Sequence, residues 1–426
     1  MDNVIPIGEI TGANFFDPAP EFDPPARGVW NIVHTGMLIP EAHQIFVCAQ
    51  GCLRGVVLTA AEMGALDRMS SVCITDRDIA LGLENGVAQA AAEILHSLSY
   101  TPKVILLYFS CMHLLSGCDI KVITDRVKKE TGCDTIDCYM APTMRKSMTP
   151  DAKMRMQLYQ ALSPLPCDHH SVNIIGNDRP TDDDSELTKI IRENGFTLRD
   201  ITLCRTYEEY LDMASSFLNI TYLPSAVPAG RSLSFGTHLH LCNSFDVQII
   251  SEQLHGLSDS LGVKTPDMTA LAAASEDALS HLHKVIGDRA VAVDYTAVTR
   301  PFDLALALVR HGMNVKYIIA DSLGEDKDEF FALQKLSPDI RIVSAVHADM
   351  IDFKGEPDVI AVGQKAAYYF DTDNFVNIVA NGGSFGFSGL MKMCSLIEDA
   401  CLHKKDHRLY IRQKGIGLPT PFREVI

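Results

Sequence analysis

Short runs of β-branched and apolar residues alternate with longer helical stretches along nearly the whole chain. Examples are 103–108, 172–176 and 290–295, each followed by a polar loop and a helical pattern. This alternation is typical of parallel sheets whose strands are joined by crossover helices. The chain has 426 residues, several times the length of one usual domain. We therefore predict an α/β fold of three Rossmann-like, doubly wound parallel-sheet domains over 1–165, 166–285 and 286–426.

Composition narrows the class of protein. Hydrophobic residues make up 47% of the chain and charged residues 21%, and no apolar run has the length of a membrane span. The net charge of −17 disfavours nucleic acid as a partner, since phosphate binding needs a basic surface. The N-terminus lacks the basic start and apolar run of a secretory signal, so we expect a cytoplasmic protein. The twelve cysteines are then expected as thiols or metal ligands.

Three of these cysteines stand where predicted strands give way to loops. Cys48, Cys73 and Cys111 could offer thiolates to an iron–sulfur cluster. Their spacing is far wider than that of ferredoxins, so spacing alone equally allows three unrelated buried thiols. Cys52 follows closely, and we expect a buried small residue there in preference to an extra ligand.

The sequence around these cysteines is more specific. Cys111 begins a Cys-x5-Gly-x-Asp-Ile pattern, Cys48 begins Cys-Ala-x-Gly, and 172–176 reads Val-Asn-Ile-Ile-Gly. Together they resemble the nitrogenase component 1 superfamily. That resemblance implies that Cys48, Cys73 and Cys111 hold half of an interfacial P-cluster or its 4Fe-4S counterpart. It also implies a β-like partner subunit in a heterotetramer and an ATP-hydrolysing iron-protein reductase.

Cys242 follows a predicted strand that carries two histidines. His238 and His240 alternate on this strand and face the same side, so they are either weak candidates for proton donors or a satisfied pair at a sheet edge. In the catalytic α-type subunits that this chain resembles, a similar loop carries the cysteine of a second, large cluster. The resemblance therefore makes Cys242 a metal ligand and the chain α-like.

Two further segments resemble the cofactor pocket of that family. Arg300, before Pro301, would compensate an anionic cluster or cap a turn. The glycine-rich loop 381–389 includes Gly383 and Phe385, and Phe385 stands where nitrogenases supply a histidine. Phenylalanine cannot bind a metal, and 145–150 also lacks the histidine expected beside the substrate. Both absences argue against dinitrogen reduction.

The resemblance implies the catalytic α-like subunit of a nitrogenase-like reductase acting on a small molecule. Cleavage of a carbon–sulfur bond in methylthio-alkanes fits the altered histidine site best. A cofactor-assembly scaffold and a tetrapyrrole reductase subunit remain as alternatives. The stretch 167–170 has too few ligands for structural zinc. The chain lacks the glycine fingerprints of nucleotide-binding loops, so ATP would belong to another protein.

Overall fold

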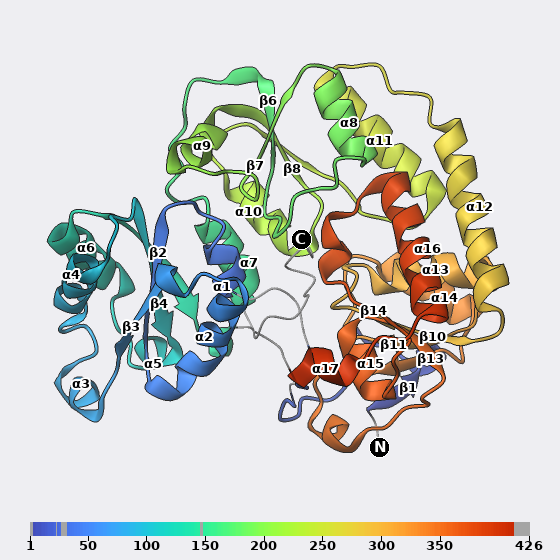
Figure 1. Ribbon diagram of the computed structural model, residues 1–426, viewed down its shortest axis with the longest axis horizontal. Coiled ribbons are helices and arrows are strands. Elements are labelled where there is room, and N and C mark those ends of the chain that lie inside the picture. Colours follow the sequence, from blue (N-terminus) through green and yellow to red (C-terminus); the bar gives the residue numbers. More distant parts are fainter. Residues whose placement is uncertain (1–2, 23, 27–31, 145–147, 413–426) are drawn as a thin grey trace.

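The structure is a computed structural model that describes residues 3–22, 24–26, 32–144 and 148–412. It contains three mainly parallel sheets, each with helices on its faces (Figure 1). In Figure 1 the first sheet lies at the left, the second at the top and the third at the lower right. The predicted α/β architecture is confirmed. In the described residues, no helix is long and apolar enough to cross a membrane.

The first sheet has the order β3-β2-β4-β5 and is entirely parallel. Its strands are β2 (Ala42–Cys48), β3 (Met69–Cys73), β4 (Val104–Ser110) and β5 (Asp134–Met140). Side chains alternate between faces: Phe46 packs with α1, α2 and α7, whereas Ile45 and Val47 pack with α4 and α6. The helical elements are α1 (Ile32–Gly36), η2 (Gln50–Cys52), α2 (Leu53–Glu62), η3 (Leu66–Arg68), α3 (Asp76–Leu81), α4 (Val87–Ser97), α5 (Cys111–Leu115), α6 (Ile120–Thr131), η4 (Pro142–Met144) and α7 (Pro150–Gln157).

The second sheet is also parallel and has the order β7-β6-β8-β9. Its strands are β6 (Asp168–Ile174), β7 (Thr197–Asp200), β8 (Ser216–Thr221) and β9 (Thr237–His240). The helical elements are α8 (Glu186–Glu193), α9 (Tyr207–Asp212), η5 (Met213–Ser215), η6 (Pro224–Ala226), α10 (Val227–Ser232), α11 (Val247–Leu261) and α12 (Thr269–Ile286).

The cap of α8 corrects one expectation. From the sequence, the acidic run 182–184 before this helix is expected to cap it, but in the structure Ser185 does so, because its hydroxyl accepts the Leu187 N–H at 3.3 Å. Asp182 turns instead toward Ser384 and Lys392 of the third unit, at 3.1 and 2.6 Å.

The third sheet has the order β1-β12-β11-β10-β13-β14. Its strands are β1 (Val4–Pro6), β10 (Ala290–Asp294), β11 (Val315–Ile319), β12 (Arg341–Val343), β13 (Val359–Val362) and β14 (Phe375–Val376). The helical elements are η1 (Ile7–Glu9), α13 (Pro301–Arg310), α14 (Lys327–Leu336), η7 (Ala348–Asp352), α15 (Gln364–Phe370), η8 (Ala380–Gly383), α16 (Gly386–Leu402) and α17 (His407–Arg412). Strand β1 pairs antiparallel with β12, so residues 4–6 lie in the third sheet although the predicted first domain included them.

The order of the strands shows where each sheet has a switch point. Among the parallel strands of each sheet, the chain starts at a central strand and later continues on that strand's other side, between β2 and β4, between β6 and β8, and between β10 and β13. Ligands of open α/β sheets bind outside the carboxyl ends of the strands at such switch points. Cys48 ends β2 and Cys111 directly follows β4, so the first switch point carries two of the predicted cluster ligands.

Candidate iron–sulfur site

The three predicted cluster cysteines lie on adjacent strands at one sheet edge. Cys48 and Cys73 are direct partners in the β2–β3 register, and the Ile74 N–H donates to the Cys48 carbonyl at 2.9 Å. Cys111 is the first residue of α5, immediately after β4, where a loop had been expected. Neighbouring strands lie about 4.8 Å apart. The fold thus places three cysteines that are 25 and 38 residues apart in the sequence at the carboxyl ends of neighbouring strands.

The chemistry of this donor set suits half of an iron–sulfur cluster. Cys48 is buried, Cys111 is partly exposed and Cys73 is exposed, so the thiols lead from the core to the surface. Burial, together with the neighbouring Cys52 and Cys73, raises the pKa of Cys48 to about 12. A soft metal would offset the cost of burying the charged thiolate by binding it. In the described part of the chain no three His, Cys, Asp or Glu side chains are grouped closely enough to hold one metal ion, so the assignment of the three cysteines to a cluster stays a prediction.

Cys52 corrects another expectation. It ends η2 and is exposed, so the prediction of a buried small residue is wrong. It lies near enough to raise the pKa of Cys48. Its thiol therefore lies in the same neighbourhood as the three predicted ligands.

The elements around these cysteines expose apolar side chains. They belong to α2, α3 and α5, which follow β2, β3 and β4, and the most exposed is Leu115 at 77%. The others are Val57, Leu58, Ile79 and Leu81. Exposed apolar groups gathered at one edge mark a surface suited to contact with another protein.

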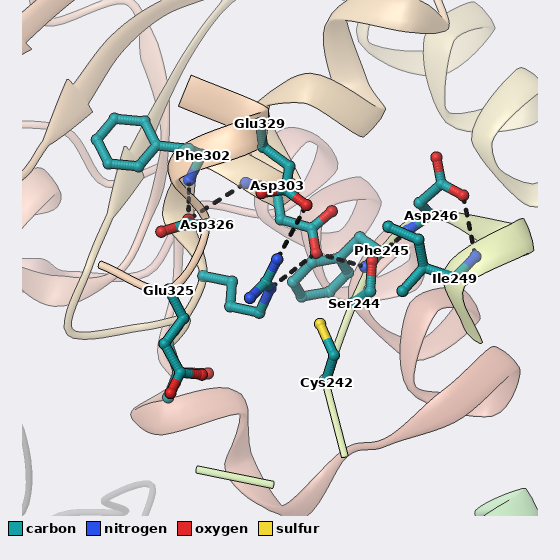
Figure 2. Close-up of polar contacts among 12 residues, drawn as sticks. Cys242, Ser244, Phe245, Asp246, Ile249, Phe302, Asp303, Glu325, Asp326 and Glu329 are labelled. Atoms are coloured by element: carbon teal, nitrogen blue, oxygen red, sulfur yellow. Dashed lines mark hydrogen bonds and ion pairs between the residues drawn. The ribbon is translucent and has the colours of Figure 1, made fainter. Parts of the chain in front are cut away.

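Cys242 lies at the carboxyl edge of the second sheet, in the loop between β9 and α11. Its thiol is partly buried, and its N–H donates to Gln253 Oε1 of α11 at 2.8 Å. Burial raises the pKa of Cys242 to about 12; Arg300 opposes this rise, while Asp303 and Glu329 add to it. Figure 2 shows the sulfur pointing toward Phe245 and Asp303.

Arg300 is already paired with carboxylates beside this cysteine. Its Nε donates to Asp303 at 3.0 Å and its Nη2 to Glu329 at 2.9 Å. Burial raises the pKa of Asp303 to about 6 although Arg300 lowers it. Arg300 is therefore not an unpaired positive charge awaiting an anionic cluster, and its assignment to a cofactor stays a prediction. The Arg-x-x-Asp spacing was the sequence signal for this pair.

The two histidines of β9 share one partner. Thr221 Oγ1 lies 2.9 Å from His238 Nε2 and 3.0 Å from His240 Nδ1. His240 Nε2 also lies 3.3 Å from Glu325, and burial lowers the pKa of His238. The geometry matches a hydrogen-bonded pair at the sheet edge, and a role in proton transfer stays a prediction.

The glycine-rich loop packs tightly against the second unit. Gly383 has φ of +88°, and a Cβ there would lie 2.3 Å from the Pro180 carbonyl oxygen, so only glycine fits. Phe385 is buried, with its ring centroid 5.2 Å from that of Tyr222. Its carbonyl accepts the Ser185 hydroxyl at 3.1 Å. Phe385 thus fills core space. Residues 145–147, in the other stretch without the expected histidine, lie outside the described residues.

At the starts of two helices in the third unit, carboxylates accept the backbone N–H groups that a phosphate would otherwise bind. Asp326 accepts the N–H groups of Phe302 and Asp303 at the start of α13, at 2.8 and 3.4 Å. Glu186 accepts the Ser388 N–H at the start of α16, at 3.3 Å. An anion at such positions would meet negative charge. These two termini are therefore poor sites for a nucleotide.

Comparison with known families agrees with this arrangement. The chain matches the family described as nitrogenase component 1 type oxidoreductase over residues 33–401. It belongs to that family. The chain is therefore a nitrogenase-like oxidoreductase subunit, of a family that binds iron–sulfur clusters and assembles with a second subunit and an iron-protein reductase.

Solved structures share the fold of this nitrogenase component 1 type chain. A structure of nitrogenase Cp1 at pH 6.5 superposes with a TM-score of 0.67 at 14% identity, covering 93% of this chain and 95% of that one. A structure of nitrogenase Cp1 at pH 5 gives a TM-score of 0.57 at 14% identity, covering 98% and 96%. Comparison with curated proteins found no match.

Proposed function

We propose that this chain is the catalytic, α-like subunit of a nitrogenase-like iron–sulfur reductase. The observation that carries the proposal is the placement of Cys48, Cys73 and Cys111 at the carboxyl ends of three adjacent strands. In this proposal they hold half of a P-cluster or 4Fe-4S cluster, which relays single electrons when bound. The chain's own part is to fix the three sulfur atoms on a rigid sheet and to limit water at the buried one.

A β-like subunit would complete this cluster in a heterotetramer. The exposed apolar side chains of α2, α3 and α5, the helices that follow the three cysteine-bearing strand ends, would be covered by that subunit. An iron-protein reductase would supply ATP hydrolysis, which agrees with the carboxylate-filled helix termini of the third unit. We place this assembly in the cytoplasm.

Substrate reduction would take place near Cys242, which we propose as the anchor of a second metallocluster. The chain contributes one thiol there, and neither Phe385 nor the paired Arg300 adds a ligand or a free charge. The residues around Cys242 thus fit a singly anchored group only. The proposed substrate is a small molecule such as a methylthio-alkane. His238 and His240 stay candidates for proton donors because they lie on β9, whose last residue, His240, stands two residues before Cys242.

The test is anaerobic co-purification with the β-like subunit, followed by iron counting and EPR on wild type, Cys242→Ala and Cys167→Ala. Cys167 is exposed and distant in sequence from the proposed ligands, so it is the matched control. We expect Cys242→Ala to lose part of the iron and one EPR signal while Cys167→Ala keeps both. Full iron retention in Cys242→Ala would rule out the second cluster.

An assembly scaffold is the second candidate. The observation that favours it is the sparse ligand set at Cys242, because a group held by one sulfur is easily passed on. A scaffold would release its second cluster to an acceptor protein and show no substrate turnover. A reductase would retain the cluster through repeated turnovers, so iron counting after turnover separates the two.

A further inference from the structure

Helix α17 is joined to the third unit through one buried histidine. His407 is the first residue of the helix, and its side chain is 6% exposed. Its Nδ1 lies 2.8 Å from Asp373 Oδ1, and its Nε2 lies 3.1 Å from Asp371 Oδ1. Its backbone N–H also donates to Asp373 Oδ1, at 3.2 Å. Both carboxylates belong to the turn between α15 and β14, so one imidazole ring connects the helix to that turn at two points.

The two contacts of the ring require a particular protonation state. A nitrogen of imidazole donates a hydrogen bond only when it carries a proton, and a neutral ring has one proton for two nitrogens. An ionised carboxylate only accepts hydrogen bonds. Because both nitrogens of His407 face carboxylate oxygens, the docked helix needs the doubly protonated, positively charged ring. A neutral ring would direct a lone pair at a carboxylate in a buried site, which is unfavourable.

The turn that receives the ring is negatively charged at neutral pH. Hydrogen bonds from Arg408 lower the pKa of Asp371, and His407 adds to this effect although burial opposes it. Burial raises the pKa of Asp373, but the contacts with His407 outweigh it, so the pKa lies below its ordinary value. Asp371 is also the C-cap of α15, and the carboxyl end of a helix favours a positive charge.

The other charged groups of α17 and of the segment before it have partners of their own. Arg408 donates from Nε to Asp371 Oδ1 at 3.0 Å and from Nη2 to Oδ2 at 2.5 Å. Lys405 pairs with Asp399 at 2.7 Å and donates to the Phe375 carbonyl at 3.4 Å. The remaining charged or titratable groups of this segment are His403, which also pairs with Asp399, the exposed Lys404, and Asp406, which accepts the Leu409 N–H.

Helix α15 packs against α17 (Figure 1) and adds lysine and tyrosine side chains only. Lys365 lies over the Tyr295 ring at 5.6 Å, and the Tyr369 hydroxyl donates to the Ala345 carbonyl at 2.7 Å. The third such side chain is that of Tyr368. Strand β14 contributes no titratable side chain. Histidine is the side-chain type that ordinarily changes its charge near neutral pH, and His407 is the buried one at this turn.

We propose that His407 is a proton-controlled latch, which holds α17 on the third unit below neutral pH and releases it as the pH becomes alkaline. Release would withdraw Tyr410, whose ring centroid lies 5.7 Å from that of the buried Phe375. Phe375 belongs to β14, the last strand at one edge of the third sheet. The latch would therefore control whether this sheet edge is covered. The inference is independent of the proposed function.

Proton linkage gives the direction of the effect. The docked helix needs the proton on His407, whereas an unperturbed imidazole loses it above about pH 6.5. Docking is therefore fully supported below that pH and weakens as the pH rises, by at most about tenfold per pH unit because one proton is involved. Asp371 and Asp373 stay ionised over this range, since their pKa values are lowered.

The test is hydrogen exchange with mass spectrometry on the anaerobically purified complex from pH 6 to pH 9, with labelling times scaled to the intrinsic exchange rate at each pH. We expect the protection of the backbone amides of 407–412 to fall at least tenfold over this range, while that of α16 stays constant. In His407→Gln the protection of 407–412 should be low at every pH. His403→Gln removes a histidine that is 70% exposed and should behave as wild type.

Two results would overturn the proposal. One is a protection of 407–412 in wild type that does not change from pH 6 to pH 9, which is what a purely structural role of His407 would give. The other is the same pH dependence in His407→Gln as in wild type. The first result needs no variant, so the test stands even where a variant folds poorly. Neither result involves iron or substrate turnover, so failure here leaves the proposed function untouched.

Discussion

Replacing Asp200 with asparagine should stabilise the protein at alkaline pH. Asp200 is 2% exposed, and its Oδ1 accepts the N–H and hydroxyl of Thr202 at 2.9 and 2.8 Å. Its Oδ2 has no partner among the described residues. Burial raises the pKa of this carboxyl from 3.8 to about 7. Asparagine keeps one acceptor oxygen and removes the charge.

The direction in which the free energy of unfolding changes with pH follows from proton linkage. Because the folded pKa lies above the unfolded one, the folded state binds the proton more tightly, and stability falls as the pH rises from about 4 to about 7. One pKa unit corresponds to about 1.4 kcal/mol, so wild type should lose about 3 kcal/mol between pH 5 and pH 8 from this group alone. Asp200→Asn lacks that loss. Asp178 and Asp303, with pKa values of about 6, titrate in both proteins.

The assay is urea unfolding followed by circular dichroism, together with hydrogen exchange of the β6 and β8 amides. We expect the difference in unfolding free energy between Asp200→Asn and wild type to shift by about 3 kcal/mol in favour of the variant from pH 5 to pH 8. Exposed Asp183→Asn should show no such shift. A difference that is independent of pH would refute the burial argument.

Further substitutions test the contact of Gly383 with the second unit and a buried ion pair within the third unit, each beside a control. Gly383→Ala should destabilise the protein by at least about 2 kcal/mol, because its Cβ would meet the Pro180 carbonyl at positive φ; Gly256→Ala, with open space in α11, should be neutral or stabilising in the same thermal scan. Arg300→Met should cost about 3–5 kcal/mol by leaving Asp303 and Glu329 unpaired. Lys316→Met breaks an exposed pair with Glu356 and should cost about 1 kcal/mol or less; equal costs for the two pairs would contradict the burial assignment.

Local patterns predicted the sheets because strands such as β4, β10 and β13 are buried apolar runs. Asp119 caps the start of α6 by accepting the Val122 N–H, and the left-handed Gly132 follows its last residue, Thr131, so both ends carry a local sequence signal. Pairing between distant segments left no such local signal. Strand β1 is only three residues long, and its partner β12 lies more than 330 residues away, so the sequence could not place it.

The candidate site, too, could be predicted from the sequence only in part. The cysteines were found from short motifs, and the strand register then placed Cys48 beside Cys73. The pairing of Arg300 depends on Glu329 of α14, and the burial of Phe385 depends on Tyr222, which follows β8. A chemical role read from residue type alone misses those contacts, because the partner decides whether a charge or a ring is free.

The central claim is that Cys48, Cys73 and Cys111 hold an iron–sulfur cluster, and Cys73 offers its most direct test. Cys73 is exposed, so Cys73→Ala removes a ligand with little loss of packing. The measurement is iron content and EPR of the anaerobic complex of Cys73→Ala beside Cys167→Ala. We predict that Cys73→Ala loses or alters the interfacial cluster while Cys167→Ala matches wild type. Unchanged iron and an unchanged EPR spectrum in Cys73→Ala would contradict the account.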